Sequence, residues 1–398
     1  MPVASIVIPC YNAQKYLHDS VASAQAQTVS DIEIICVNDG STDDTLDILR
    51  RLASEDARIH VIDQPNGGEG PARDAGLCAA TGDWLYFLDA DDLMEPTLLE
   101  EAIAACTQHD ADVVVFRTMM LDEKTQEKRL CEFSFKRSWT EGDCFVPGEN
   151  PDHLFNSFQN WVHNKVFRGS FVRENNLHMQ HVHRTADLLF TCHALTLARR
   201  IALLDKPLHT YRVNNAQSAM QTSDAYPLDF YQAFLALRES LEADGTWELY
   251  HDSYVNWAIE GVCINLRCVR SFEGYSTIVH TMQEEGLRAL DIVGFPRSKS
   301  DRTFYYDNVV CLEDLSSEEV LFRYASIYKV ETNDAETECS RLRLERDHLR
   351  QERDYYLNDL LIPITNSASF KIGRAITSLP RKLRDLVGAE LSRRRTKS

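Results

Sequence analysis

The sequence predicts an α/β fold, with a mostly parallel sheet covered by helices on both faces, followed by a helical C-terminal region. Three observations predict it. Short, continuous apolar runs alternate with helix-like segments through the first 120 residues of the 398-residue chain, as in a sheet buried on both faces. Polar clusters follow the ends of successive runs, where open parallel sheets bind ligands. From Pro227 to Glu285 the apolar spacing becomes helical throughout.

The elements can be placed in chain order. Strands are expected where short runs are rich in apolar and β-branched residues, at 5–9, 32–37, 59–62, 84–88 and 112–116. Helices are expected between them, with Asp or Thr near several of their starts, at 15–27, 43–53, 71–80 and 97–108. A further helix-like frame runs from Arg184 to Thr196, within a region of mixed signals.

Composition narrows the class of protein. With 44% hydrophobic and 26% charged residues the chain is globular, and its length suits two domains or one with an appendage. The net charge of −19 argues against nucleic acid as a partner, because phosphate binding requires a basic surface. The eleven cysteines form no CxxC pair, and those in apolar runs (Cys10, Cys36, Cys78, Cys106) suggest reduced, buried thiols. No apolar stretch approaches the ~18 residues of a membrane span, and no signal peptide is recognisable, so a cytoplasmic location is expected.

An acidic turn follows the fourth apolar run. Trp84–Leu88 ends in Asp89-Ala90-Asp91-Asp92, which places three carboxylates beyond a buried strand. Hard divalent cations take oxygen ligands, and Mg²⁺ typically combines one or two carboxylates with phosphate oxygens of a substrate, a chemistry that Mn²⁺ shares. The alternative is a solvated turn in which Asp92 caps the next helix.

Two other loops carry polar residues at strand ends. Asn38–Asp43 suits a tight turn into a helix, where Asp39 accepts hydrogen bonds from a base or sugar and Asp43 caps the helix. Asn66–Gly76 supplies glycines for close backbone approach and then Arg73, whose fork suits phosphate. Simple turn chemistry also explains such glycines. A Rossmann dinucleotide site is disfavoured, because Pro9-Cys10-Tyr11-Asn12 replaces the glycine fingerprint.

These motifs together carry a specific resemblance. The ordered set IVIPCYNAQKYL, VNDGSTDDT, NGGEGPARDAG and WLYFLDADD resembles the donor half of inverting family 2 glycosyltransferases of the GT-A fold. The resemblance covers residues 3–120 strongly, weakens toward 218 and is absent from the helical segment that follows. It implies transfer of a sugar from a nucleotide-sugar, UDP-linked in the commonest case, with a Mn²⁺ or Mg²⁺ cofactor. The acceptor would be a hydroxyl of a glycan or lipid-linked glycan in cell-surface polysaccharide synthesis.

The resemblance also implies a donor site. The region of Pro9, Tyr11 and Asn12, with Asp39, would hold base and ribose, and Asp89 and Asp91 would form a DxD motif gripping ribose and metal-bound diphosphate. The donor-binding residues expected on this basis are Pro9, Tyr11, Asn12, Asp39, Asn66, Arg73, Asp89, Ala90, Asp91 and Arg212.

The catalytic base must lie in the acceptor half, because inversion needs one carboxylate to take the proton of the attacking hydroxyl. Family members usually carry Glu-Asp before a helix there, and this chain reads Ala186-Asp187. Asp187 is the expected base, with a helix-capping Asp as the alternative. The missing Glu favours a rival function, a nucleotide-sugar-binding protein without turnover. A nucleotidyltransferase is disfavoured, since the first strand is not followed by a basic, glycine-rich loop.

A second motif follows further along. Leu208-His209-Thr210-Tyr211-Arg212 resembles the closing strand of the family. His209 is therefore expected to join Asp91 as a metal ligand or to contact the diphosphate, or else to be a packed or hydrogen-bonded histidine. Arg212 would neutralise charge on the leaving group.

The expected domains are a glycosyltransferase domain at 1–218, with donor half 1–120 and acceptor half 121–218, and a helical domain at 219–330. Residues 331–361 suit either a short coiled coil that forms a homodimer or a solvated spacer helix. The tail at 362–398 mixes basic and apolar residues. From residue 368 it carries nine Lys or Arg against two acids, a net of +7, which leaves −26 on the remainder. It is expected either to contact the anionic inner face of the plasma membrane or to be a solvated basic terminus.

Overall fold

The computed structural model describes residues 1–213 and 223–323. Residues 1–317 form one compact unit. The charged segment at 331–361 and the basic tail at 362–398 lie outside the described residues.

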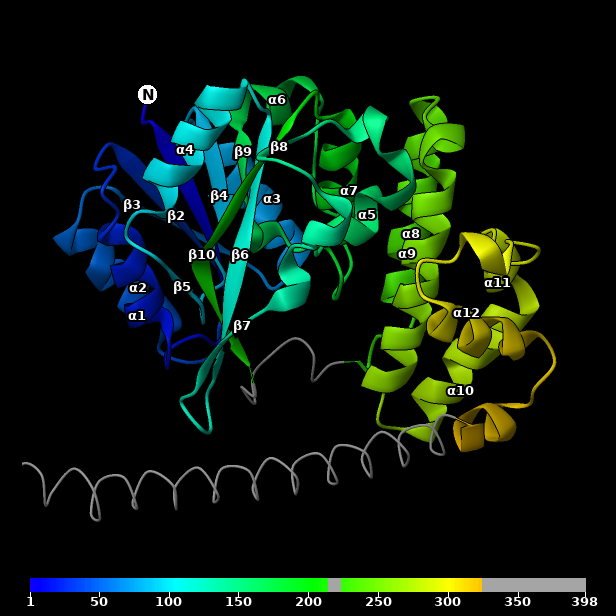
Figure 1. Cartoon of the computed structure of the whole chain (residues 1–398). Coiled ribbons are helices and arrows are strands. Elements are labelled where there is room, and N and C mark those ends of the chain that lie inside the picture. Colours follow the sequence, from blue (N-terminus) through cyan, green and yellow to red (C-terminus); the bar gives the residue numbers. More distant parts are fainter. Residues whose placement is uncertain (214–222, 324–398) are drawn as a thin grey trace, which may run out of the picture. The chain divides into compact units, whose positions relative to one another are not determined.

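A ten-stranded sheet lies at the centre of this unit, in the order β3-β2-β1-β4-β9-β6-β10-β5, with β7 beside β6 and β8 beside β10 (Figure 1). The neighbours β1 and β2, β2 and β3, β1 and β4, and β6 and β10 pair in parallel, while β9 runs antiparallel between β4 and β6. The predicted, mostly parallel α/β sheet is therefore confirmed. The strands are β1 Ala4–Cys10, β2 Ile32–Asp39, β3 Ile59–Gln64, β4 Trp84–Phe87, β5 Leu93–Met94, β6 Val113–Asp122, β7 Lys128–Leu130, β8 Cys144–Phe145, β9 Lys165–Arg168 and β10 Ile201–Val213.

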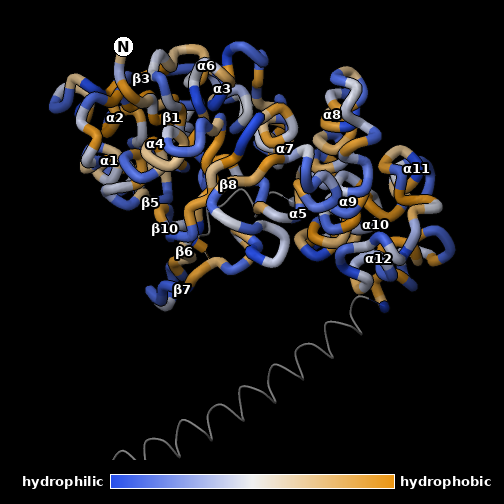
Figure 2. Tube along the Cα trace, turned by 45° about the horizontal axis from the view of Figure 1, so that its top comes forward, coloured by the Kyte–Doolittle hydropathy of each residue, from blue (hydrophilic) through white to orange (hydrophobic). Residues whose placement is uncertain are grey.

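Helices cover both faces of the sheet. Ile6 and Ile8 of β1 share a buried cluster with residues of α1, α2 and α4, whereas Val7 faces Gly76 of α3. Successive strand residues point to opposite faces, so α3 lies on the other side of the sheet. Figure 2 shows hydrophobic colour along the strands and hydrophilic colour on outer turns. The helices of this part are α1 Leu17–Gln25, α2 Thr45–Glu55, α3 Glu69–Ala79, α4 Leu98–His109, α5 Leu154–Ser157, α6 Gly169–Glu174 and α7 Asp187–Leu197.

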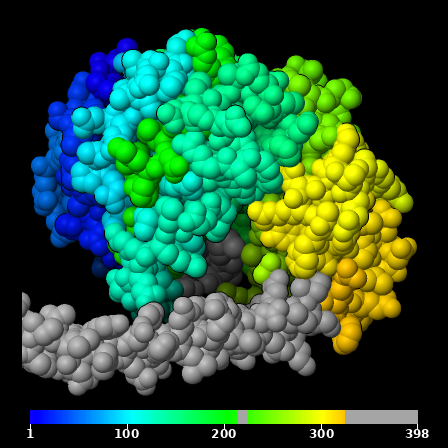
Figure 3. Space-filling model, in the orientation of Figure 1, coloured from blue at the N-terminus to red at the C-terminus, as the bar shows by residue number. Residues whose placement is uncertain are grey.

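The predicted helical region follows β10. It consists of α8 Asp229–Ala243, α9 Trp247–Cys268, α10 Phe272–Thr281, a π turn at Met282–Gly286, α11 Leu287–Ala289 and α12 Thr303–Val310. Between β6 and β9 the chain forms short turns and 3₁₀ segments instead of long elements. In Figure 3 the cyan to sea-green part of the chain, which includes this segment, forms much of the visible surface.

The strand ends bring the polar loops together. Because β1, β2, β3 and β4 are parallel, the loops after them leave from one edge of the sheet. Gly40 after β2 has φ +66, and a Cβ there would lie 2.6 Å from the backbone nitrogen of Asn66. Glycine at this position therefore lets the loops after β2 and β3 touch.

The structure excludes one alternative and corrects one prediction. Asp92 does not cap a helix: it is fully buried, β5 follows it, and α4 begins only at Leu98 after Thr97. Cys78, expected to be buried, lies exposed on α3, whereas Cys10, Cys36 and Cys106 are buried free thiols.

Candidate active site

Asp39 joins the loops that follow β2 and β3. Its carboxylate, 3% exposed, accepts hydrogen bonds from the backbone N–H groups of Gly67 and Gly68 at 2.9 and 2.8 Å, and from the Gln64 side chain at 2.8 Å. The carboxylate thus holds the glycine loop in place. Its contact with a base or ribose stays a prediction.

The loop after β1 lies beside the loop after β2. Asn12, in the left-handed region at φ +48, accepts a hydrogen bond at Oδ1 from the backbone N–H of Thr42 at 2.8 Å. The preceding Tyr11 is 54% exposed, so its ring is accessible to a ligand. Pro9 pairs with Val37 in the sheet, and Asn66 is exposed on the glycine loop. The structure thus places all four predicted residues at or near one edge of the sheet.

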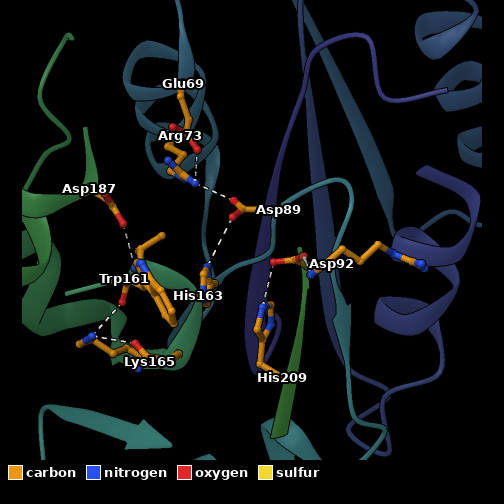
Figure 4. Close-up of polar contacts among 12 residues, drawn as sticks. Glu69, Arg73, Asp89, Asp92, Trp161, His163, Lys165, Asp187 and His209 are labelled. Atoms are coloured by element: carbon orange, nitrogen blue, oxygen red, sulfur yellow. Dashed lines mark hydrogen bonds and ion pairs between the residues drawn. The ribbon is translucent and has the colours of Figure 1, made fainter. Parts of the chain in front are cut away.

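Arg73 on α3 links that edge to the acidic turn (Figure 4). Its Nη2 lies 2.6 Å from Glu69 Oε1 and 2.6 Å from Asp89 Oδ1, and the side chain is 2% exposed. Among the described residues, no group accepts a hydrogen bond from its buried Nε or Nη1. A buried guanidinium with unmet donors is costly unless a further anion or oxygen reaches it.

Charge sets the protonation of this cluster. Burial opposes ionisation of Asp89, but Arg73 and His163 together outweigh the effect of burial and lower the pKa of Asp89. Burial raises the pKa of Glu69, Arg73 opposes that rise, and the charges of Asp89 and Asp187 add to it. Asp187 therefore belongs to the same electrostatic cluster as Arg73 and the acidic turn.

A buried cluster of Asp92, His163 and His209 lies next to Asp89. The ligating atoms of these three residues all lie within 4.8 Å of one another. Asp92 Oδ2 is 3.0 Å from His209 Nε2, and the rings of His163 and His209 stack with centroids 4.3 Å apart. Nδ1 of His163 lies 3.4 Å from Asp89 Oδ2. Burial lowers the pKa of His209 to about 3, so its imidazole is neutral at physiological pH.

This cluster fits a divalent cation. The buried Nε2 of His163 has no hydrogen-bond partner among the described residues, and a neutral imidazole nitrogen is a metal ligand. One carboxylate with two imidazoles suits Mn²⁺ better than Mg²⁺, which prefers oxygen. The predicted ligand Asp91 is half-buried on the same turn but is not a member of the cluster, and Ala90 beside it is buried.

Arg212 takes part through its backbone. Its N–H donates to Asp92 Oδ1 at 2.8 Å, while its guanidinium lies 3.4 Å from Glu123 and 3.5 Å from Asp19 and over the ring of Tyr16. The backbone of Arg212 therefore orients Asp92, and the predicted neutralisation of a leaving group stays untested.

Asp187 is the first residue of α7, where a negative charge suits the helix dipole. Its Oδ2 accepts a hydrogen bond from the backbone N–H of Val162 at 3.2 Å, in a separate segment of the chain. The carboxylate is half-buried and so partly accessible to an acceptor. Ala186 before it is fully buried, 3.2 Å from where a Cβ on Gly70 would lie.

The segment carrying Trp161 and His163 was not identified from the sequence. Lys165 anchors it, since its buried Nζ donates to the carbonyls of Gln159 and Trp161 at 2.7 and 2.8 Å and to Asn164 Oδ1 at 2.7 Å (Figure 4). Burial lowers the pKa of Lys165 to about 7, whereas its three acceptors favour the ammonium form. The sequence signal that could have identified this segment is Lys165 itself, a charged residue with aromatic and polar neighbours inside an apolar stretch.

Asp187 also lines a pocket. This cavity of about 200 Å³ lies between the 159–161 and 184–188 segments on one side and α8 and α9 on the other. Its lining residues include Trp161, Asp187, Phe230, Phe234, Trp257 and Ile264. We call it the α9 pocket.

The chain is similar in sequence to known glycosyltransferases. Residues 5–175 match the family model described as glycosyl transferase family 2. The uncharacterized glycosyltransferase EpsJ of Bacillus subtilis is 33% identical over 218 residues, which is 54% of this chain and 62% of EpsJ. The poly(ribitol-phosphate) beta-N-acetylglucosaminyltransferase TarS of Staphylococcus aureus is 26% identical over 60% of this chain and 41% of TarS. The chain thus spans less than two thirds of either relative.

The fold is also similar to a solved structure. The crystal structure of residues 1–349 of S. aureus TarS in complex with UDP-GlcNAc aligns over 77% of this chain and 90% of that one, with a TM-score of 0.53 and 20% identity. At this identity the similarity concerns the fold alone.

Proposed function

We propose that the chain is an inverting, metal-dependent glycosyltransferase of family 2, because residues 5–175 match the model of that family. It would move a sugar from a nucleotide-sugar, UDP-linked by preference, to a hydroxyl of a glycan or lipid-linked acceptor in cell-surface polysaccharide synthesis. The observation that carries the proposal is the buried guanidinium of Arg73. Two of its N–H donors lack partners among the described residues, and it interacts with the carboxylates of Asp89 and Asp187.

Arg73 would contact the donor. Its Nε–H and Nη1–H would donate hydrogen bonds to oxygens of the nucleotide diphosphate. Asp89, which the Nη2 of Arg73 keeps ionised, would accept a hydrogen bond from a ribose hydroxyl. Asp91 and His209 are the proposed metal ligands, joined by His163 and Asp92. A bound divalent cation would stabilise negative charge on the diphosphate.

Asp187 would act as the general base. As the acceptor oxygen bonds to the anomeric carbon, its proton passes to the Asp187 carboxylate. The bond from the anomeric carbon to the phosphate oxygen breaks and releases the nucleoside diphosphate. The backbone N–H of Val162 holds Oδ2 of Asp187, so the carboxylate keeps a fixed orientation during this transfer.

The rival function is a nucleotide-sugar-binding protein without turnover, and Ala186 is the observation that favours it. One feature of the site argues against this rival function. Glu69 places a carboxylate 2.6 Å from Arg73, and this carboxylate interacts electrostatically with Asp187. The site therefore holds a second carboxylate even though residue 186 has none.

Calorimetry with UDP and MnCl₂, beside an assay of UDP release from a panel of UDP-sugars, tests the proposal. The wild type should bind UDP and release it from a UDP-sugar. Asp187→Asn should keep UDP binding and lose transfer, whereas Asp47→Asn, on the exposed face of α2, should match the wild type. Binding without release by the wild type supports the rival, and no UDP binding refutes both.

Membrane contact and dimerisation are separate proposals. Among residues 1–213 and 223–323, none of the helices combines the length and apolar character needed to cross a bilayer. We propose that the basic tail contacts anionic lipid. The full chain should then float with phosphatidylserine liposomes, and a chain that lacks residues 368–398 should not. Sedimentation velocity with and without residues 331–398 would test dimerisation through the charged segment.

A further inference from the structure

We propose that the α9 pocket binds an N-acetylated sugar of the acceptor, and that residues of α8 and α9 determine this specificity. The inference extends the proposed function, on which it rests. The family model ends at residue 175, so the wall formed by α8 and α9 lies outside the matched region. The helical region would thus supply specificity to a donor-binding domain of the family.

The position of the pocket supports an acceptor role. Asp187 and Trp161 belong to one wall, while Phe230, Trp257 and Ile264 belong to the other. Helix α7 contacts α8, and α5 contacts α9, so both walls are packed against the domain that carries the proposed base. A sugar in this pocket would present a hydroxyl toward Asp187. The volume of about 200 Å³ is below the ~300–1,000 Å³ of drug-sized ligands and suits one monosaccharide unit.

The chemistry of the lining points to an acetamido group. Six of the thirteen lining residues carry apolar or aromatic side chains, and the others are mainly polar. Two of the thirteen have a buried polar atom with no hydrogen-bond partner among the described residues, Oδ1 of Asn160 and Nε1 of Trp257. One is an acceptor and the other a donor, and a buried polar atom left without a hydrogen bond is unfavourable. An acetamido group brings an N–H, a carbonyl oxygen and a methyl group. It would satisfy both atoms and cover apolar side chains such as Leu188 and Ile264.

The backbone around the pocket is held in costly geometry. Thr185, two residues before Asp187, has φ +61, which is unusual for a β-branched residue and is a form of strain found at ligand sites. On the opposite wall Gly261 allows close approach, because a Cβ there would lie 2.5 Å from the ring of Phe234. A larger residue at 261 would push this ring and change the shape of the pocket.

Saturation-transfer difference NMR on the full chain, with UDP and MnCl₂ present, tests the proposal. The probes are the methyl β-glycosides of N-acetylglucosamine, glucosamine and glucose. The wild type should bind the N-acetyl glycoside saturably and at least about tenfold more tightly than the other two glycosides. A tenfold difference in affinity is what one or two buried hydrogen bonds contribute. Trp257→Phe, which removes the indole N–H and keeps an aromatic ring, should reduce that preference several-fold.

A variant that fills the α9 pocket provides a second test of the proposal. Ile264→Trp enlarges a half-buried lining residue and should abolish binding of the N-acetyl glycoside, whereas Leu249→Trp, on the same helix at a 44% exposed position, should not. Calorimetry of UDP on each variant keeps the two proposals apart. If UDP binds but no glycoside does, or if binding shows no N-acetyl preference or survives Ile264→Trp, the pocket assignment is overturned while the donor site stands. If UDP does not bind, the proposed function itself is refuted.

Discussion

Replacing Arg73 by Met should destabilise the protein strongly and in a pH-dependent way. The guanidinium is 2% exposed and lies 2.6 Å from both Glu69 and Asp89. At an effective dielectric constant of ~20, each contact is worth about 6 kcal/mol of gross Coulomb attraction, which the burial of the charges largely offsets. Removing the cation alone leaves two carboxylates unpaired, and we expect a loss of about 3–5 kcal/mol in the free energy of unfolding at pH 7.

The pH dependence follows from the two carboxylates. In the wild type the pKa of Asp89 is lowered, so its contribution to stability is present above its unfolded pKa of about 4 and is lost only as the pH falls further. Without Arg73, burial raises the pKa of Asp89, and that of Glu69 further. The native state then binds more protons than the unfolded state above about pH 4, and stability falls as pH rises. The difference from wild type should therefore be smaller at pH 5 than at pH 7.5.

Urea unfolding at both pH values measures the effect. Arg50→Met is the control, because Arg50 is 61% exposed and its ion pairs with Asp47 and Asp63 are 3.7 and 3.5 Å long. That change should cost less than about 1 kcal/mol. If Arg73→Met costs no more than Arg50→Met, or its cost does not vary with pH, Arg73 is not the cation that holds this cluster together.

Three further predictions concern neighbouring groups. Lys165→Met leaves three buried oxygen acceptors without their donor and should lower the free energy of unfolding by about 3–5 kcal/mol in urea titrations, with Lys206→Met as an exposed control. His163→Ala should weaken Mn²⁺ binding at least about tenfold by calorimetry in the presence of UDP, since metal ligation would lose one nitrogen. Asp56→Asn removes the carboxylate paired with Arg58 at 2.8 Å and should cost about 1 kcal/mol at pH 7. Because the pKa of folded Asp56 is lowered, chiefly by Arg58, that difference should shrink as the pH falls below about 4, where the unfolded chain takes up a proton while the folded carboxylate is still ionised.

The sequence predicted the polar loops at the strand ends well, because the information for them is local. The runs that form β1 to β4 end in polar loops, and parallel strands bring such loops to one edge, so the contact of Asp39 with the glycine loop and that of Arg73 with Asp89 follow from topology. Element ends differ by a few residues, and β6 extends to Asp122 because it pairs with the long β10.

The remainder depends on contacts between distant segments. The ring of His163 stacks on that of His209 because β9 lies antiparallel between β4 and β6. No local sequence pattern predicts this position of β9. The sequence left a helix cap open as the alternative role of Asp92, whereas its burial beside His209 and Arg212 arises from tertiary packing. The α9 pocket likewise needs α7 to pack on α8, a contact between segments with no shared motif.

A crystal structure with UDP and MnCl₂ tests the central assignment most directly. We expect an anomalous manganese signal within coordination distance of His209 and of the diphosphate, with the guanidinium of Arg73 against the nucleotide. A nucleotide bound elsewhere, or an acidic turn directed away from it with no manganese at His209, would contradict the account.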